Sequence, residues 1–286
     1  MQDFQGKVAV ITGGSTGIGY GIAEKCLKEG MKVVIASIGE DSAARAEARL
    51  KESYPEAHLL GIRTNVSKAV EVEELARRAL DAFGAVDLLF NNAGVSFSGS
   101  YIWENTAKDW EWMLGINLMG VVHGVRTFVP IMLAQNTECH IVNTSSMAGV
   151  LSSGFVGAYG VSKHAVVALS EILQAQLKEQ GSKIKVSVLC PGFVKTEFYN
   201  AERSRPAALW NETPPAPSSE GFRQVISNGM DPAEVAAKVF RALEDEKFYI
   251  LTHPQFTKYI GMRMENILED RDPTYGAASF TDSLSN

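Results

Sequence analysis

The sequence is poor in cysteine and has no strong excess of either charge. Its three cysteines, Cys26, Cys139 and Cys190, form neither a CxxC pair nor a cluster with metal-ligand spacing, which argues against a disulfide framework and against a metal site. We interpret them as small buried thiols in a reducing compartment. The 33 acidic and 27 basic residues give a net charge of -6 without basic clusters, so we expect no nucleic-acid partner.

Long apolar runs and targeting signals are missing as well. The start, MQDFQGKVAVITGG, lacks a basic segment followed by a long apolar stretch, and no run in the chain approaches the ~18 apolar residues of a membrane span. We therefore expect a soluble, cytoplasmic protein without a membrane partner. With 286 residues, of which 45% are hydrophobic, the chain can bury a large core without disulfide or metal staples.

What the sequence does contain is a regular alternation of two patterns. Short runs rich in Val, Ile and Leu predict strands covered on both faces, at 8–12, 33–37, 58–62, 86–90, 140–144, 186–190 and 248–252. Between them lie longer segments with helical periodicity, at 19–29, 43–54, 70–83, 160–180 and 232–243. This alternation predicts right-handed βαβ units and hence an α/β fold, a single Rossmann-like, doubly wound domain over residues 1–286 with helices on both faces of a parallel sheet.

One segment, 199–230, interrupts the alternation between the sixth and seventh runs. A long irregular insertion in a compact domain is usually a lid or a binding loop. We predict that this insertion closes over a substrate and excludes water. The polar tail, 271–286, is expected to be loosely held.

A glycine-rich turn follows the first predicted strand, with the sequence TGGSTGIG at 12–19. Gly13, Gly17 and Gly19 open the next helix, and glycine lets the backbone adopt a positive φ and approach a phosphate closely. The N-terminus of that helix offers unpaired N–H groups and a partial positive charge to a pyrophosphate. A glycine-rich turn alone can be a simple strand-to-helix connection, but after the first strand of a βαβ series it predicts a dinucleotide site.

The end of the second predicted strand bears on the choice of cofactor. An acid at this position accepts hydrogen bonds from the adenosine ribose and repels a 2′-phosphate, whereas this strand ends in Ser37. We therefore favour NADP(H) over NAD(H). NAD(H) stays open, because neither Thr16 nor Ile38 supplies a cation for the phosphate and Glu40 and Asp41 follow closely.

A second group of polar residues follows the fifth predicted strand, where Ser146, Tyr159 and Lys163 occur in order. Residues four apart share a helix face, so the Lys163 ammonium is expected near the Tyr159 phenol. A nearby cation lowers the pKa of a phenol from its ordinary ~10 towards neutral pH, which suits the proton transfer that accompanies hydride transfer to a carbonyl. Ser146 would donate a hydrogen bond to the substrate oxygen.

Together these pieces resemble the short-chain dehydrogenase/reductase family. The matching motifs are TGGSTGIG at 12–19, NNAG at 91–94, GINLMG at 115–120, YGVSK at 159–163 and PGFVKTE at 191–197. The resemblance implies a seven-stranded parallel sheet, with Tyr159 as general acid/base and Lys163 holding the nicotinamide ribose. It also implies that Ser146 orients the carbonyl and that Asn117 holds a water linking Lys163 to solvent.

The same resemblance implies a set of cofactor-binding residues. Asn91, Ala93 and Gly94 would line the ribose side, and Asn65 would approach the adenine. The chain would turn beneath the nicotinamide at 191–192 and reach its carboxamide at 194 and 196. The full set is Gly13, Ser15, Thr16, Gly17, Ile18, Gly19, Ser37, Asn65, Val66, Asn91, Ala93, Gly94, Tyr159, Lys163, Pro191, Gly192, Val194 and Thr196.

The substrate side is expected to be apolar, which suits a hydrophobic ketone or secondary alcohol. Besides Ser146, we predict substrate contacts from Met147, Phe97, Phe193, Tyr199 and Trp210. The segments SRPAALWN and FYILTHP resemble a branch of the family that acts on bulky secondary alcohols. Three arginines of the insertion are expected to be solvated lid charges rather than ligands of a carboxylate, namely Arg203, Arg205 and Arg223.

The favoured function is therefore an NAD(P)(H)-dependent short-chain alcohol dehydrogenase or carbonyl reductase. Two alternatives stay open: a non-catalytic dinucleotide sensor that binds protein partners, and an epimerase or dehydratase on the same scaffold. Apolar stripes over 113–133 and 156–177 correspond to helices that build oligomers in the family. The resemblance therefore implies a homodimer or homotetramer.

Overall fold

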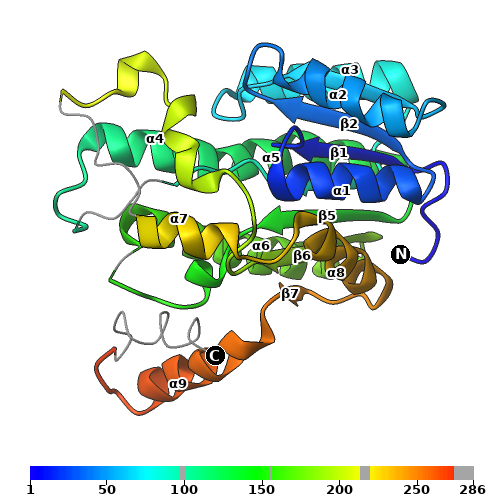
Figure 1. Cartoon of the computed structure of the whole chain (residues 1–286). Coiled ribbons are helices and arrows are strands. Elements are labelled where there is room, and N and C mark those ends of the chain that lie inside the picture. Colours follow the sequence, from blue (N-terminus) through cyan, green and yellow to red (C-terminus); the bar gives the residue numbers. More distant parts are fainter. Residues whose placement is uncertain (97–100, 155, 213–219, 274–286) are drawn as a thin grey trace.

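The computed structural model describes residues 1–96, 101–154, 156–212 and 220–273. Seven strands form one parallel sheet in the order β3-β2-β1-β4-β5-β6-β7 (Figure 1). The strands are β1 Val8–Thr12, β2 Lys32–Ser37, β3 Leu59–Arg63, β4 Leu88–Asn91, β5 Cys139–Thr144, β6 Ile184–Cys190 and β7 Tyr249–Leu251. Because all strands are parallel, their carboxyl ends lie along one edge, and the motifs that follow them gather there.

Helices cover both faces of the sheet. They are α1 Gly17–Lys28, α2 Ser42–Ser53, α3 Ala69–Phe83, α4 Ala107–Asn117, α5 Met119–Gln135, α6 Gly157–Glu179, α7 Glu220–Ser227, α8 Pro232–Glu244 and α9 Thr257–Leu268. One apolar cluster joins α1, α2 and α8 to one face of the sheet, and a second joins α3, α4, α5 and α6 to the other. The Rossmann-like architecture and the two helix layers predicted from the sequence are thus confirmed.

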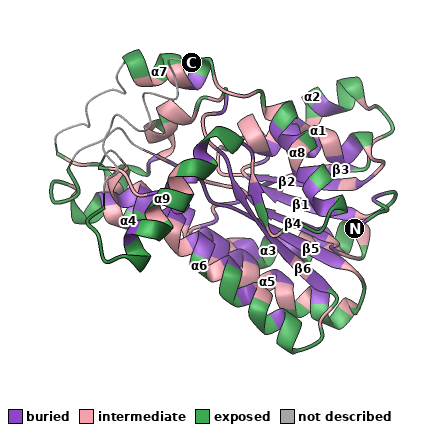
Figure 2. Ribbon diagram, turned by 90° about the horizontal axis from the view of Figure 1, so that it is seen from below, coloured by how far each residue is buried: buried purple, intermediate pink, exposed green. Residues whose placement is uncertain are grey.

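Burial explains why these residues form these elements. All five residues of β1 are buried, and successive side chains of a strand point to opposite faces, so Ala9 and Ile11 join one core cluster and Val10 the other. Figure 2 shows buried strands in the middle and exposed outer surfaces on the helices. A strand covered on both faces must be apolar at every position, which is the pattern the sequence displays.

The sequence did not predict α7 or α9. Helix α9 follows β7 and lies at the lower edge of the molecule in Figure 1. Only Asn266 among its residues is buried, so it carries little of the apolar stripe by which a helix is predicted. Helix α7 lies inside the insertion, which also contains short 3-10 helices at Phe198–Ser204 and Ala207–Leu209. The insertion is therefore partly helical.

One described stretch, Ala107–Gln135, is long and apolar enough by composition to cross a membrane. It consists of two helices, α4 and α5, which meet at Leu118. Core helices pass the same test, and Trp112, Met113 and Phe128 of this stretch are buried against the sheet. No such stretch was expected from the sequence, because polar residues interrupt each of its apolar runs.

Candidate active site

The glycine-rich turn between β1 and α1 leaves no room for side chains. Gly13 and Gly17 have positive φ angles of 65° and 56°. A Cβ on Gly13 would lie 2.8 Å from the Ala93 Cα, and one on Gly19 would lie 2.3 Å from the Gly13 carbonyl oxygen. Thr16 is the N-cap of α1 but its side chain forms no capping hydrogen bond, and the first turn contains no acid. Bare backbone at a helix N-terminus fits a pyrophosphate.

Two polar side chains hold this turn against the neighbouring strand end. Thr12 Oγ1 accepts hydrogen bonds from the backbone N–H groups of Asn92 at 3.0 Å and Ala93 at 3.1 Å. The Asn92 amide donates in return to the Thr12 carbonyl oxygen at 3.1 Å. The ends of β1 and β4 are therefore fixed to each other beside the glycine turn. Sequence reasoning missed both residues, although each lies within a recognised motif.

Asn91 lies away from the predicted cofactor side. Its side chain is buried between the sheet and α5, where Nδ2 donates to Asn143 Oδ1 at 2.9 Å. A Cβ on Gly124 of α5 would lie 2.1 Å from Asn91 Oδ1. The Asn91 side chain therefore faces α5, and a contact of this residue with the cofactor ribose stays a prediction. The physical reason is the alternation of side chains along β4, which turns position 91 towards α5.

The end of β2 carries a cluster of three hydroxyl groups. Ser37 Oγ lies 2.8 Å from Ser15 Oγ and accepts a hydrogen bond from Ser42 Oγ at 2.7 Å. In the sheet, Ser37 pairs in register with Arg63 of β3, a cation that the sequence analysis overlooked. Neighbouring register partners of a parallel pair present their side chains to the same face.

Asn65 and Val66 follow the end of β3. Asn65 Oδ1 accepts hydrogen bonds from the Ser67 backbone N–H at 3.0 Å and from Ser67 Oγ at 2.8 Å. The amide oxygen expected at the adenine is therefore engaged within its own loop. Val66 is buried, and its carbonyl oxygen lies 2.9 Å from His123 Nδ1 of α5.

Lys163 of α6 enters the interior at the carboxyl edge of the sheet. Its side chain is almost fully buried, and Nζ donates to the Thr144 carbonyl oxygen at 2.9 Å. Burial lowers the pKa of this ammonium to about 8. A Cβ on Gly94 would lie 3.5 Å from Lys163 Nζ and 3.4 Å from Asn117 Oδ1. Lys163 and Asn117 therefore converge on Gly94, where the backbone lacks a side chain.

Tyr159 lies one helical turn before Lys163, as predicted from their spacing, but its electrostatics differ from the prediction. The Lys163 Nζ lies 5.7 Å from the centre of the Tyr159 ring. Burial nevertheless raises the pKa of the Tyr159 phenol to about 12, and a hydrogen bond from Ser146 offsets only part of that rise. The predicted lowering by Lys163 is not found, because desolvation dominates and the ammonium is directed to Thr144.

Asn117 ends α4 and is fully buried. Its Oδ1 accepts a hydrogen bond from the Val95 N–H at 2.8 Å, and its Nδ2 donates to the Val95 carbonyl oxygen at 3.0 Å. Nδ2 also lies 3.1 Å from Ser162 Oγ, which in turn donates to the Tyr159 carbonyl oxygen at 2.7 Å. Asn117 thus connects the chain after β4 to the helix turn that carries Tyr159.

Ser146 follows β5 and faces the turn that follows β6. Its Oγ accepts from the Ala148 N–H at 3.1 Å and lies 3.4 Å from the Pro191 carbonyl oxygen. That carbonyl also accepts from the Met147 N–H at 2.9 Å. The structure therefore brings Ser146, Tyr159, Lys163 and Asn117 together at the carboxyl edge of the sheet.

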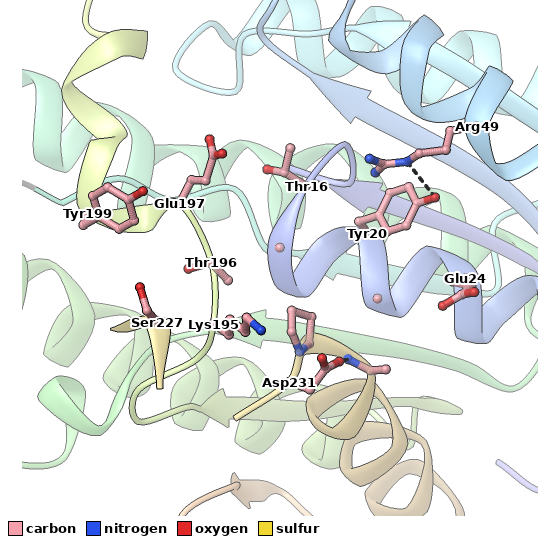
Figure 3. A pocket seen from close by; sticks show the side chains of 14 residues that line it. Thr16, Tyr20, Glu24, Arg49, Lys195, Thr196, Glu197, Tyr199, Ser227 and Asp231 are labelled. Atoms are coloured by element: carbon pink, nitrogen blue, oxygen red, sulfur yellow. Dashed lines mark hydrogen bonds between the residues drawn. The ribbon is translucent and has the colours of Figure 1, made fainter. Parts of the chain in front are cut away.

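A cavity of about 510 Å³ opens beside the glycine turn. In Figure 3, Thr16, the N-cap of α1, and Tyr20 of α1 lie on one side of it, and Thr196 and Tyr199 lie on the other. Thr196 also approaches the glycine turn directly, since a Cβ on Gly17 would lie 2.9 Å from its Cγ2. Predicted cofactor positions after the first and sixth strands thus line one cavity from opposite sides.

The predicted substrate contacts lie in different places. Met147 is buried in a third apolar cluster, against which Phe193 packs. Tyr199 lines the cavity beside α1, and Trp210 is 60% exposed, with Nε1 donating to the Arg205 carbonyl oxygen. Phe97 lies outside the described residues. The Phe198 ring packs against the phenol, with its centre 5.8 Å from the Tyr159 ring centre.

Arg205 corrects an expectation about the insertion. It was predicted to be a solvated charge, but its side chain is 1% exposed and lies 2.6 Å from Asp109 Oδ1 of α4. Asn211 Nδ2 donates to the same carboxylate oxygen at 2.9 Å. Arg203, in contrast, is exposed and pairs with Glu197. The prediction failed for Arg205 because its partner is distant in the sequence.

Three comparisons with known proteins bear on this arrangement. A sequence model of the short chain dehydrogenase family matches residues 7–207. The chain is 37% identical to a CLA biosynthesis dehydrogenase/reductase from Lactiplantibacillus plantarum, covering 96% of this chain and 97% of the relative. It is 32% identical to a C alpha-dehydrogenase from Sphingobium sp., over 96% of this chain and 89% of the relative.

Among solved structures, a short chain dehydrogenase/reductase from Burkholderia phymatum in complex with NAD superposes with a TM-score of 0.91. It is 46% identical, and the match covers 96% of this chain and 98% of that one. A family match over most of the chain, a shared fold and the observed strand order agree with one another. The chain is a member of the short-chain dehydrogenase/reductase family, whose members are dehydrogenases and reductases.

Proposed function

We propose that this chain is an NAD(P)(H)-dependent oxidoreductase that interconverts hydrophobic ketones and secondary alcohols, with Tyr159 as the acid/base. The proposal rests on one observation. At the strand ends beside the glycine turn, a side-chain hydrogen-bonding contribution from Ser146 lowers the pKa of the Tyr159 phenol against the effect of burial, and Lys163 Nζ lies 5.7 Å from the ring centre. A phenol supplied with a hydroxyl donor and an ammonium suits proton exchange with a carbonyl oxygen.

The nicotinamide dinucleotide, when bound, donates or accepts the hydride. The residues that would hold it are the bare backbone at Gly13, Gly17 and Gly19 for the phosphates, and the side-chain-free Gly94 near the ribose. The crowding around Gly13, Gly17 and Gly19 supports this assignment, because a side chain there would collide with Ala93, Thr196 or the Gly13 carbonyl. Val194 and Thr196 would supply contacts from the opposite wall.

The raised pKa of Tyr159 suits ketone reduction. With a pKa of about 12, the phenol holds its proton at neutral pH and can pass it to a developing alkoxide, which is the stronger base. Ser146 would orient the carbonyl oxygen towards the phenol. In alcohol oxidation the phenol must first lose its proton, and movement of Lys163 from Thr144 towards the phenolate would favour that loss. Asn117 would hold the relay water beside Lys163.

The substrate is proposed to be apolar and bulky, with the insertion at 199–230 as its lid. Two contacts support this proposal. The ring of Phe198, the residue directly before the insertion, packs edge-on against the Tyr159 ring, which places an apolar wall beside the acid/base. The buried Arg205–Asp109 pair then fastens the insertion to α4. An apolar wall of this kind excludes water from the reacting groups.

For the cofactor we propose a preference for NADP(H). At the end of β2, Ser37 stands in place of an acid and forms a cluster of hydroxyl groups with Ser15 and Ser42. Arg63 of β3 lies next to Ser37 in the sheet. The Burkholderia phymatum structure contains NAD, so both cofactors must be compared. The preference would be overturned by a lower KM for NADH than for NADPH with the same ketone.

The oligomer is also part of the proposal. Val161 and Ile172 of α6 are 46% and 57% exposed, and Met119 of α5 is 39% exposed. Exposed apolar side chains on these two helices support a homodimer or homotetramer. Light scattering on the purified chain distinguishes these states from a monomer.

The catalytic assignment is tested with Tyr159→Phe. The variant keeps the ring that packs on Phe198 and loses only the hydroxyl, so we expect cofactor binding within about 3-fold of wild type. We expect turnover of an aryl ketone to fall about 10³-fold, the range of a lost acid/base group. Oxidation of NADPH or NADH with a ketone panel measures turnover. A variant as active as wild type would falsify the assignment of Tyr159.

A further inference from the structure

His253 lies just after β7 and beneath the turn that follows β6. The imidazole is 7% exposed. Its Nδ1 accepts a hydrogen bond from the Gly192 backbone N–H at 3.1 Å, and its Nε2 lies 3.1 Å from the Phe193 carbonyl oxygen. The imidazole therefore contacts the backbone of two consecutive residues, Gly192 and Phe193. The motif THP, which holds His253, has no role in the proposed chemistry.

The partners of the imidazole determine its tautomer. A backbone N–H can only donate, so Nδ1 must carry a lone pair towards Gly192. A carbonyl oxygen can only accept, so Nε2 must carry the proton that is donated to Phe193. Thr252 Oγ1 lies 2.7 Å from Nδ1 and is therefore a second donor to it. His253 is neutral, with its proton on Nε2.

Close packing fixes the turn on both sides. A Cβ on Gly192 would lie 2.8 Å from His253 Cγ, and one on Gly229 would lie 2.7 Å from the Phe193 carbonyl carbon. The Phe193 carbonyl oxygen also accepts from the Met230 N–H at 3.0 Å. The turn is thus held between the segment after β7 and the end of the insertion.

The held turn leads directly to the catalytic groups. One residue before Gly192, the Pro191 carbonyl oxygen lies 3.4 Å from Ser146 Oγ and accepts from the Met147 N–H. Ser146 in turn lowers the pKa of the Tyr159 phenol through a side-chain hydrogen-bonding contribution. In the other direction, the chain continues from Phe193 to Thr196, which lines the cavity beside the glycine turn. Any shift of the turn would reach both sides of the site.

We propose that His253 is a positioning residue for hydride transfer. By bonding both Gly192 and Phe193 it fixes the turn after β6, and this turn sets the positions of Ser146 and of the cavity wall that faces the cofactor. This inference rests on the proposed function. Burial keeps the pKa of His253 below its ordinary value, with opposing contributions from Lys238 and Glu234 of α8, which is consistent with a neutral ring. The residue touches neither substrate nor cofactor in this role and acts through the turn.

Three substitutions separate the two hydrogen bonds. His253→Asn keeps an acceptor near the position of Nδ1, His253→Gln keeps a donor near that of Nε2, and His253→Leu keeps the bulk but neither bond. We expect kcat for ketone reduction to fall on the order of 100-fold in the Leu variant, the effect of a misplacement of about 1 Å. The Asn and Gln variants should each have a kcat at least about 5-fold higher than that of the Leu variant, because one hydrogen bond is worth about 1 kcal/mol.

The matched control is His140→Leu. His140 is also buried and bonds Ser187 on the neighbouring strand, but it is not part of the site. We expect this variant to lose melting temperature and to keep kcat and the cofactor KM within about 2-fold. Similar losses of kcat in His140→Leu and His253→Leu would mean that His253 has only a structural role. Equal kcat values for the Leu, Asn and Gln variants would also overturn the inference.

A measurement without turnover separates this inference from the proposed function. Amide hydrogen exchange at Gly192 should accelerate at least about 10-fold in His253→Leu, because its acceptor is lost, while exchange in β1 stays as in wild type. If wild type reduces no ketone, the proposed function fails, and the exchange at Gly192 still decides whether His253 holds the turn. Unchanged exchange would overturn the inference even in an active enzyme.

Discussion

Arg205 Nη2 and Asp109 Oδ1 lie 2.6 Å apart in the interior, although 96 residues separate them in the sequence. The guanidinium also donates through Nε to the Leu209 carbonyl oxygen and lies 5.1 Å from the Trp112 ring centre. Burial alone would raise the pKa of Asp109, but hydrogen bonds from Thr106, Arg205 and Asn211 lower it below the ordinary value. The insertion is thereby fastened to the first turn of α4.

Breaking this pair should free the insertion. Removing one partner of a buried ion pair costs about 3–5 kcal/mol, and we expect the loss to appear as local opening because α4 keeps its cap from Thr106. Arg205→Met should speed proteolysis within 198–212 and raise KM for a bulky ketone about 10-fold. The control is Arg203→Met, whose exposed pair with Glu197 is worth at most about 1 kcal/mol. Equal sensitivity of the two variants would contradict the fastening role.

Because the Lys163 ammonium is buried, the free energy of unfolding should vary with pH in the alkaline range. Its folded pKa of about 8 lies below its ordinary 10.5, so the unfolded chain binds the extra proton between these values. The contribution of Lys163 to the free energy of unfolding is therefore fully present above about pH 10.5. It falls by about 1.4 kcal/mol per pH unit as the pH decreases to about 8, and it does not change further below pH 8. Urea unfolding of wild type and Lys163→Met at pH ~7.5 and ~9.5 measures the difference. A difference that does not change with pH would refute the buried-charge account.

His140 should lower the free energy of unfolding as the pH becomes acidic. Burial lowers its pKa from 6.5 to about 3, with the N-terminal ammonium and Lys185 adding to the effect. The unfolded chain binds the proton first, so stability is present above about pH 6.5 and declines towards pH 3. Relative to His140→Leu, wild type should lose about 2 kcal/mol between pH ~7 and pH ~5. Parallel unfolding curves for the two proteins over that range would rule this out.

A comparison of two glycines with positive φ separates the cost of a strained backbone from the cost of a steric collision. Gly13 and Gly84 have φ angles of 65° and 79°, but a Cβ on Gly13 would meet Ala93 at 2.8 Å, whereas one on Gly84 would have nothing within 4 Å. Gly84→Ala should cost about 1–2 kcal/mol, the price of a left-handed backbone. Gly13→Ala should cost about 1–3 kcal/mol more and reduce dinucleotide affinity at least about 10-fold. Chemical denaturation and cofactor titration measure both effects, and equal costs would show that Ala93 yields freely.

Much of the fold was predictable from local patterns. The bounds of β1 agree with the prediction at both ends, because a strand buried on both faces shows a continuous apolar run between polar flanks. Helix α9 was missed because its side chains are mostly exposed. The burial of Arg205 was missed because the partner that makes it tolerable, Asp109, belongs to another element. Long-range pairing of charges leaves no periodic signal.

For the site, motif spacing predicted which residues meet but not their electrostatic balance. Lys163 lies one turn from Tyr159, as their spacing requires, yet the phenol pKa is raised because desolvation depends on everything packed around the ring. The backbone carbonyl of Thr144, which receives the Lys163 hydrogen bond, has no sequence signature, since every residue carries one. His253 was overlooked for the related reason that its partners in the turn after β6 are main-chain atoms.

Helix α4 carries Asp109 in its first turn and Asn117 at its end. The two lie eight residues apart, about 12 Å along a rigid helix axis at 1.5 Å per residue. The insertion, which contacts Asp109 through Arg205, is therefore joined by one continuous helix to Asn117, which bonds Val95 and Ser162. The segment proposed as the lid and the residue proposed to hold the relay water thus share a single helical support.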